Sequence, residues 1–295
     1  MNKWTNFKFL LFFLLFFSLP ALASNIKGIY INGGTVMDSK ELNYLIQRAK
    51  ATGIDTFIVD FEHASNTYQK NVAQLRQNGI HYVARIVVFP EGGTPDRINS
   101  IPYREKKLQQ IQNAIAYGAE AIQLDYIRYN TSLGRSDQHV SDVDNVIGWF
   151  KQRVNVPLQV DVFGITSFGP EKHIGQDVRL IARQVDALCP MDYPSHFQPF
   201  APHSAKPWQT VYNALTALKS QFDNKVPVKI IAWIEMSNYH YILTNKARQK
   251  YIAAQIRAVD DANVNGWYAW SPNNYYDNLF DVLESGQDKE GHQDS

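Results

Sequence analysis

Short hydrophobic runs and longer amphipathic segments alternate along the chain. Eight runs of six to nine residues are rich in β-branched and aromatic residues, which is typical of buried strands. They cover residues 27–32, 55–61, 81–89, 120–127, 158–163, 186–191, 228–235 and 266–271. The pattern predicts eight strands, separated by segments that are long enough to form helices.

The intervening segments carry the periodicity of amphipathic helices. Leu42, Leu45, Ile46 and Ala49 lie at i, i+3, i+4 and i+7, so they predict a helix over 39–52. Similar apolar stripes predict helices over 104–117, 142–154, 208–222 and 246–262, and shorter, weaker stripes mark 68–78 and 176–184.

This alternation of strands and helices predicts the fold class. Eight βα units in roughly 270 residues have the size and pattern of a single (β/α)8 TIM barrel, an α/β fold. A doubly wound open sheet is the alternative, and a GxGxxG loop after the first strand would favour it. The sequence there, "YINGGTVMD", has two glycines but not that spacing. We predict one barrel over residues 24–284 and a polar tail over 285–295.

The N-terminal segment has the features of an export signal. Lys3 and Lys8 precede an apolar run over residues 9–23, which ends in the small-x-small sequence Ala21–Leu22–Ala23. The run is shorter than the ~20 residues that a membrane-spanning helix needs. We therefore predict a signal peptide over residues 1–23 and an exported protein, periplasmic or extracellular, with no stable membrane insertion after cleavage.

Composition narrows the partners. The net charge is +1, from 29 basic and 28 acidic residues, so no overall field favours nucleic acid or a membrane surface. Cys189 is the only cysteine, so no internal disulfide can form, and its apolar surroundings predict a small buried hydrophobe. Aromatic residues make up 13% of the chain, enough to serve a binding surface as well as a core. We expect a monomer.

Two neighbouring strands repeat a pattern of inward polar residues. Because strand side chains alternate between faces, Gln123 and Asp125 share one face of the fourth strand, and apolar residues share the other. Gln159 and Asp161 repeat this arrangement on the fifth strand. Both acids then lie toward the carboxyl end of the barrel, where enzymes of this fold hold their active sites.

Other strands also end in acids. Asp60 and Glu62 end the second strand, Asp192 follows the sixth, and Glu235 ends the seventh. When several acids lie close together, their mutual repulsion raises the pKa of some of them, so that one carboxyl stays protonated while another is ionised. Glycoside hydrolysis needs such a pair. For any single acid, the alternative is a helix cap or a structural ion pair with an arginine.

These acids give the candidate catalytic residues. We predict Asp125 with Glu235 as its partner, because the fourth and seventh strands lie on opposite sides of a barrel mouth. Asp161 and Asp192 are the alternative partners. Arg128 is expected to keep Asp125 ionised; the alternative is a buried Asp–Arg pair that only fixes the loop.

Aromatic and polar side chains at the strand ends are candidates for substrate binding. Flat rings stack on sugar faces, and their hydroxyl or N–H groups can form hydrogen bonds. The candidate substrate-binding residues are Asp60, Glu62, Arg85, Tyr126, Arg128, Tyr129, Tyr193, His196, Trp233 and Trp270.

Other chemistries lack their motifs. Barrel metallohydrolases need clustered histidines, but the sequence has no His-x-His and its histidines are scattered. It also has no Gly-x-Ser-x-Gly elbow and no P-loop. We therefore expect neither a metal nor a cofactor.

Two motifs carry a family resemblance. "AIQLDYIRYN" and "CPMDYPSHF", with "DVFG" and "GQD" between them, resemble the bacterial family of putative glycoside hydrolases with a TIM barrel. The resemblance covers about residues 28–281. It implies a barrel that acts on a polysaccharide, with Asp125 as a catalytic carboxylate. Chitinase-like barrels carry Asp-x-x-Asp-x-Asp-x-Glu on the fourth strand, whereas only Asp125 stands here, so substrate-assisted chemistry is not expected.

Two further functions stay open at this point. A carbohydrate-binding barrel without turnover would show the same acids and aromatic rings, but no second carboxylate at catalytic distance from Asp125. A hydrolase of another bond in the cell envelope, such as an amide or an ester, is the third possibility.

Overall fold

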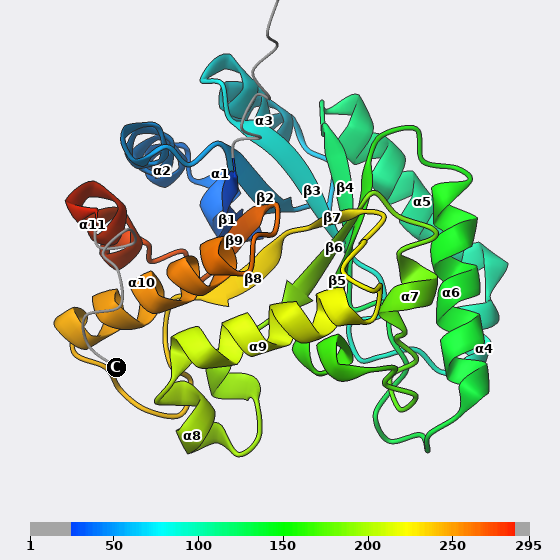
Figure 1. Ribbon diagram of the computed structural model, residues 1–295. Coiled ribbons are helices and arrows are strands. Elements are labelled where there is room, and N and C mark those ends of the chain that lie inside the picture. Colours follow the sequence, from blue (N-terminus) through cyan, green and yellow to red (C-terminus); the bar gives the residue numbers. More distant parts are fainter. Residues whose placement is uncertain (1–24, 287–295) are drawn as a thin grey trace, which may run out of the picture.

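A computed structural model describes residues 25–286, which form a closed parallel β-barrel surrounded by helices (Figure 1). The predicted signal peptide and most of the predicted polar tail lie outside this range, so both stay predictions. The strands are β1 (Ile26–Ile31), β2 (Thr56–Asp60), β3 (His81–Val87), β4 (Ala121–Asp125), β5 (Leu158–Phe163), β6 (Ala187–Met191), β7 (Lys229–Ile230), β8 (Ala232–Glu235) and β9 (Gly266–Trp270).

The sheet closes because β5 pairs with β6 as well as with β4, which joins the two ends of the strand order. β1 pairs with β2 and β9, and β5 pairs with β4 and β6. β7 and β8 both pair with β6, and they are two segments of the seventh barrel strand, interrupted at Ile231. The predicted (β/α)8 barrel is thus confirmed, and all eight predicted strands form within a few residues of their expected ends.

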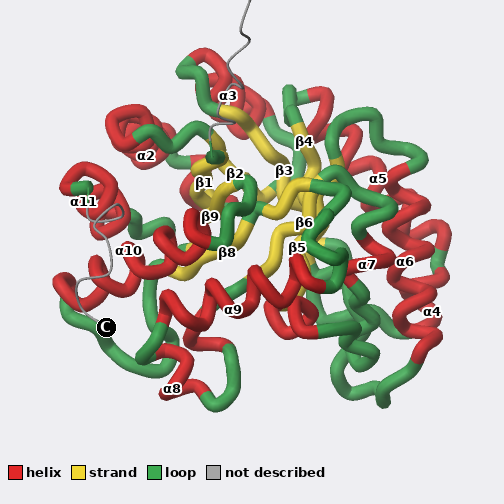
Figure 2. The backbone as a smooth tube through the Cα atoms, in the orientation of Figure 1, coloured by secondary structure: helices red, strands yellow, loops and turns green. Residues whose placement is uncertain are grey.

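Helices cover the outside of the barrel, and Figure 2 shows them as a ring around the central strands. The longer ones are α2 (Ser39–Thr52), α3 (Asn66–Gln77), α5 (Ile101–Ala116), α6 (Asp137–Lys151), α9 (Pro207–Ser220), α10 (Asn245–Asp261) and α11 (Asp277–Ser285). The predicted helix over 176–184 is only one turn, α7 (Val178–Ile181). No helix within residues 25–286 is long and apolar enough to cross a membrane.

Short helical turns lie in the loops that follow the strands. They are α1 (Gly33–Met37) after β1, α4 (Pro95–Asn99) after β3, the 3-10 helix η1 (Gly164–Phe168) after β5, and η2 (Pro194–His196) with α8 (Phe200–Ser204) after β6. The periodicity did not predict these turns, because each is too short to show an apolar stripe.

The hydrophobic side chains inside the barrel form a cluster separate from those packed between the strands and the helices. Cys189, Trp233 and Tyr268 belong to the interior cluster, where Cys189 is fully buried as predicted. Gln159 accepts hydrogen bonds from the amide of Gln123, at 3.4 Å, and from the hydroxyl of Tyr268, at 3.2 Å. Because both glutamines point inward, the acids two residues further along each strand reach the mouth of the barrel.

Candidate active site

A cavity of about 710 Å³ opens at the carboxyl ends of the strands. Its lining is mainly aromatic and apolar, with carboxyl groups and one arginine at the base. It is lined by Arg85, Asp125, Tyr126, Asp161, Phe163, Gly164, Ile165, Met191, Tyr193, His196, Phe197, Gln198, Phe200, Trp233, His240 and Trp270. The cavity therefore draws on β3 to β6, β8 and β9 and on the loops that follow them.

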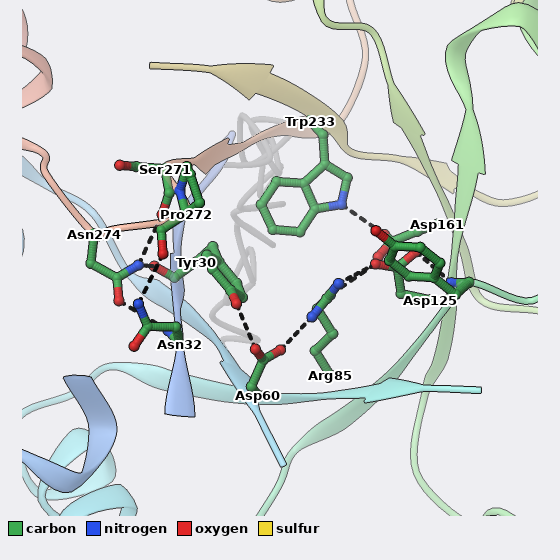
Figure 3. A network of polar contacts seen from close by, with 11 residues as sticks. Tyr30, Asn32, Asp60, Arg85, Asp125, Asp161, Trp233, Ser271, Pro272 and Asn274 are labelled. Atoms are coloured by element: carbon green, nitrogen blue, oxygen red, sulfur yellow. Dashed lines mark hydrogen bonds and ion pairs between the residues drawn. The ribbon is translucent and has the colours of Figure 1, made fainter. Parts of the chain in front are cut away.

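Arg85 joins two carboxylates at the base of this cavity (Figure 3). Its Nη1 pairs with Asp60 from β2, and its Nη2 and Nε pair with Oδ2 of Asp125 from β4, the Nε at 3.0 Å. The hydroxyl of Tyr30 donates to the other oxygen of Asp60 at 2.5 Å. The pairing follows from register, because Arg85 lies opposite Asp60 on β2, and β3 also adjoins β4.

The local backbone fixes the second oxygen of Asp125. Tyr126 has a φ of +51°, in the left-handed region that side chains other than glycine rarely adopt. In this conformation its backbone N–H donates to Oδ1 of Asp125 at 2.5 Å. Such backbone conformations persist where the surroundings determine them, and functional sites often hold them. Both oxygens of Asp125 are thus positioned while the residue lines the cavity.

Asp161 differs electrostatically from Asp125, although they stand on adjacent strands. Burial, and then the negative charge of Asp125, raise the pKa of Asp161 well above its usual range, while Arg85 and a hydrogen bond from Trp233 act in the opposite direction. The indole Nε1–H of Trp233 donates to Oδ1 of Asp161 at 2.7 Å. The surroundings thus favour the protonated form of Asp161, beside a carboxyl group, that of Asp125, which is paired with Arg85.

The predicted role of Arg128 is wrong. It was expected to pair with Asp125, but Arg85 takes that place, since it points into the barrel from the neighbouring strand. Arg128 instead donates to the backbone oxygen of Tyr129 at 3.0 Å and lies over the rings of Tyr126 and Phe163. It therefore contacts two rings of the cavity lining without lining the cavity itself.

Glu235, the predicted partner of Asp125, is fully buried and does not line the cavity. Its carboxylate accepts hydrogen bonds from the backbone N–H and hydroxyl of Ser195, both at 2.7 Å, and from the hydroxyl of Tyr251 at 2.6 Å. Burial raises its pKa to about 7, and these hydrogen bonds act in the opposite direction. This position does not favour direct contact with a substrate.

Asp192 is also fully buried and does not line the cavity. It follows Met191, which lines the cavity, so strand alternation directs the Asp192 side chain away from it. Burial raises the pKa of Asp192 well above its usual range, with the hydroxyl of Ser167 acting in the opposite direction. Its burial therefore favours the neutral form of Asp192, outside the cavity lining.

The predicted substrate-binding residues divide into two groups. Those that line the cavity are Arg85, Tyr126, Tyr193, His196, Trp233 and Trp270. Those outside its lining are Asp60, which Arg85 and Tyr30 hold, exposed Glu62, Arg128, and Tyr129, whose hydroxyl donates to Asp142.

Several lining residues were not predicted as site residues. Phe163 and Gly164 belong to "DVFG", one of the motifs of the resemblance, so that motif was a usable signal. Phe200 and His240 come from loops after the sixth and seventh strands, and their rings stack 4.1 Å apart. Loop residues of this kind follow no periodicity, so the sequence pattern gave no signal for them.

Gly164 lies where the loops after β5 and β6 approach too closely to leave room for a side chain. A Cβ at this position would lie 2.6 Å from the backbone oxygen of Met191 and 2.7 Å from the ring of Phe197. The glycine therefore allows η1 to pack against the loop after β6, and both segments line the cavity.

The fold is a TIM barrel with carboxyl groups at its mouth, an arrangement that glycoside hydrolases use. Residues 103–276 match the family described as "Putative glycosyl hydrolase domain", and the chain belongs to that family. No curated protein matches the sequence.

Solved structures resemble the chain at low sequence identity. The spore cortex-lytic enzyme SleL of Bacillus cereus is 14% identical, with a TM-score of 0.64 over 89% of this chain and 74% of that one. An endo-1,4-beta-mannanase of Rhizomucor miehei is 12% identical, with a TM-score of 0.64 over 90% of this chain and 95% of that one. A chitinase of Chromobacterium violaceum is 12% identical, with a TM-score of 0.60 over 89% and 99%. At these identities the likeness shows the fold.

Proposed function

We propose that the protein hydrolyses glycosidic bonds in an oligosaccharide or polysaccharide, with Asp125 and Asp161 as the catalytic pair. The observation that carries the proposal is the contrast between the two carboxyl groups on adjacent strands. Asp125 is an ion-paired carboxylate, whereas burial and the charge of Asp125 raise the pKa of Asp161. Glycosidases need this contrast between a proton donor and a carboxylate.

The proposed reaction assigns a role to each group. Asp161 donates its proton to the oxygen of the leaving sugar, which avoids expelling an alkoxide. Asp125 then follows one of two routes. Either it attacks the anomeric carbon and forms a glycosyl ester, which water hydrolyses while Asp161 takes the proton of that water, or it takes the proton of a water molecule that attacks the anomeric carbon directly. Arg85 holds Asp125 in place from one side, and Trp233 holds Asp161 from the other.

The cavity lining favours sugars without acidic groups. Among the lining residues, Arg85 is the only arginine or lysine, and two carboxylates already occupy it. Burial, and then nearby His240, lower the pKa of His196, so that this histidine is neutral at pH 7. The rings of Tyr193 and Trp270 stack with centroids 5.2 Å apart and present apolar surface to a sugar face.

The structural neighbours support the same substrate class. Their names describe enzymes that lyse spore cortex, or that act on mannan or chitin. Mannan and chitin are polysaccharides, so we extend that class, but no particular sugar, to this chain.

The proposed site of action is outside the cytoplasm. This rests on the charged and apolar pattern of residues 1–23 alone, which lie outside the described structure. N-terminal sequencing of the protein recovered from outside the cytoplasm tests it. We expect the first residue near Ser24, and an intact Met1 would contradict cleavage.

A polysaccharide screen tests the activity. The purified protein is incubated with cell-wall and extracellular polysaccharides, and new reducing ends are measured. Asp125→Asn and Asp161→Asn should each lower the rate by about 100-fold or more, since each removes one half of the pair. Asp142→Asn is the matched control, because Asp142 is a buried acid that binds Tyr129 outside the cavity lining.

The screen also separates turnover from binding alone. Saturable binding of a polysaccharide without new reducing ends would replace the hydrolase with a carbohydrate-binding barrel. Full activity in both Asp125→Asn and Asp161→Asn would place the catalytic groups elsewhere.

A further inference from the structure

Glu235 links two loops that border the cavity. Its carboxylate binds both the backbone N–H and the hydroxyl of Ser195, at 2.7 Å each, and Ser195 lies in η2 between Tyr193 and His196. The Ser195 hydroxyl also accepts the backbone N–H of Tyr239, at 3.3 Å, from the loop after β8. One buried carboxylate thus connects the loop after β6 with the loop after β8.

Glu235 is itself held firmly. The side chain of Gln255 in α10 accepts the backbone N–H of Glu235 at 3.0 Å and donates to its backbone oxygen at 2.9 Å. Tyr251, one helical turn earlier, donates its hydroxyl to the carboxylate at 2.6 Å. Glu235, which links the two loops, is therefore bound to α10, while the loops carry the side chains that face the cavity.

The connected loops supply rings to the cavity. Tyr193 and His196 line it, and Tyr193 stacks on Trp270. Tyr239 lies 5.3 Å from His196 and 5.2 Å from Trp270 between ring centroids. A shift of Ser195 would therefore move the group of rings that we assign to sugar binding.

We propose that Glu235 is a positioning residue, whose ionised carboxylate fixes the loops after β6 and β8 through Ser195 and so orders the aromatic wall of the cavity. The assignment of these rings to sugar binding rests on the proposed function. The contacts that carry it are independent of any substrate.

Protonation of Glu235 disturbs this arrangement for a chemical reason. The carboxylate accepts three hydrogen bonds, and all three partners donate. A carboxylic acid has a proton of its own to donate, so a hydroxyl that now donates to Glu235 must accept that proton and turn its own proton away. Where this hydroxyl is that of Ser195, its proton loses the acceptor it had. A buried donor without a partner is costly, so the loop that carries Ser195 loosens. The wall should then be ordered above the pKa of Glu235 and looser below it.

Asp192, at the start of the loop after β6, also has a pKa raised by burial, so the loss of the transition in Glu235→Gln is what assigns it to Glu235. The tyrosines and the histidine around Glu235 do not contribute to it. Tyr251 of α10, Tyr193 of the loop after β6 and Tyr239 of the loop after β8 all have pKa values raised by burial, so they stay neutral. The pKa of His196 is lowered, first by burial and then by His240, so it titrates below Glu235.

Hydrogen–deuterium exchange tests the proposal without a substrate. Exchange of segments 192–198 and 236–241 is followed across the pH range around 7, after correction for the intrinsic rate. In the unaltered protein both segments should become better protected as the pH rises. In Glu235→Gln they should exchange about tenfold faster at high pH and show no transition.

A second variant distinguishes titration of Glu235 from a general structural effect. Tyr251→Phe removes a hydrogen bond that lowers the pKa of Glu235, so its transition should move to higher pH. Asp142→Asn removes a buried carboxylate that also binds a tyrosine hydroxyl, but outside the cavity lining, and should leave both segments unchanged. Unchanged protection in Glu235→Gln, or an unmoved transition in Tyr251→Phe, would overturn the proposal.

Kinetics with any substrate found in the screen adds an independent reading. Glu235→Gln should raise KM about tenfold and change kcat much less, because it alters the binding wall rather than the reacting groups. Loss of kcat with unchanged KM and unchanged exchange would instead make Glu235 catalytic and reject positioning. If the exchange results hold but no polysaccharide is cleaved, the positioning role stands and the hydrolase proposal fails.

Discussion

At the scale of single residues, the ion pairs of Arg85 decide how the acids at the cavity base behave. Two carboxylates share one largely buried guanidinium, whose side chain is 13% exposed, so its removal would leave both without an ion-pair partner. Breaking a buried pair from one side costs about 3–5 kcal/mol. Arg85→Gln should therefore lower the free energy of unfolding by roughly 3 kcal/mol, measured by urea denaturation.

Arg128→Gln is the matched control for Arg85→Gln. Arg128 contacts a backbone oxygen and two rings but has no ion pair in the described structure, so its loss should cost about 1 kcal/mol. Equal losses in the two variants would contradict the special position of Arg85.

Asp161 gives a second prediction at this scale. A general acid works only while protonated, so kcat/KM should fall as the pH rises through the raised pKa of Asp161. The hydrogen bond from Trp233 lowers that pKa, so Trp233→Phe should move the fall in activity to higher pH. The pH–rate profiles of the two proteins provide the measurement, and a shift to lower pH would exclude Asp161 as the acid.

At the scale of elements, Gly164 sets how closely the loops after β5 and β6 approach. Gly164→Ala would place a methyl group 2.6 Å from the backbone oxygen of Met191, so η1 must shift. We expect a loss of about 1–3 kcal/mol in the free energy of unfolding, together with weaker sugar binding. Gly134→Ala is the control, because a Cβ there meets nothing within 4 Å; equal losses would mean that close approach is not what matters at Gly164.

The elements were predictable from the sequence because their signals are local. Strand and helix periodicities lie within ten to twenty residues, and inward alternation placed Asp125 and Asp161 at the cavity. The pairing of Asp125 was not predictable in this way. Arg128 is its neighbour in sequence, but Arg85 reaches it from the adjacent strand, and strand register comes from the assembled barrel.

Glu235 shows the same limit at its own strand end. Its place at the end of a strand was read correctly, and alternation suggested an open position at the mouth. Its actual partners, Ser195 and Tyr251, come from a loop and an outer helix that are distant in sequence. Long-range contacts of this kind determine whether a carboxyl group faces a substrate or fixes a loop, and they carry no local signature.

At the scale of the whole molecule, the barrel buries several acids whose pKa values are raised, and this sets how stability depends on pH. Asp161, Asp192 and Glu235 all hold protons more tightly in the folded chain than in the unfolded one, mainly because of burial. Between the two pKa values of such a group the folded state binds more protons, so stability falls as the pH rises. Asp186 acts in the opposite direction. Burial alone would raise its pKa, but its contacts with Lys151 and Leu158 lower it, and the residue is more exposed than the other three.

Glu235 allows the size of this effect to be predicted. Its pKa rises from 4.5 to about 7 on folding, and each unit corresponds to about 1.4 kcal/mol, so its contribution is on the order of 3 kcal/mol. That stability is fully present below pH 4.5 and is lost as the pH rises through about 7. In Glu235→Gln the side chain at this position no longer titrates. Across this pH range the free energy of unfolding of the variant should therefore fall by about 3 kcal/mol less than that of the unaltered protein. Urea denaturation of both proteins at matched pH values measures the difference, and parallel curves would show that Glu235 keeps an ordinary pKa in the folded protein. The burial of this charge would then have no measurable cost, and the change in order of the cavity wall should lie near pH 4.5 and not near 7.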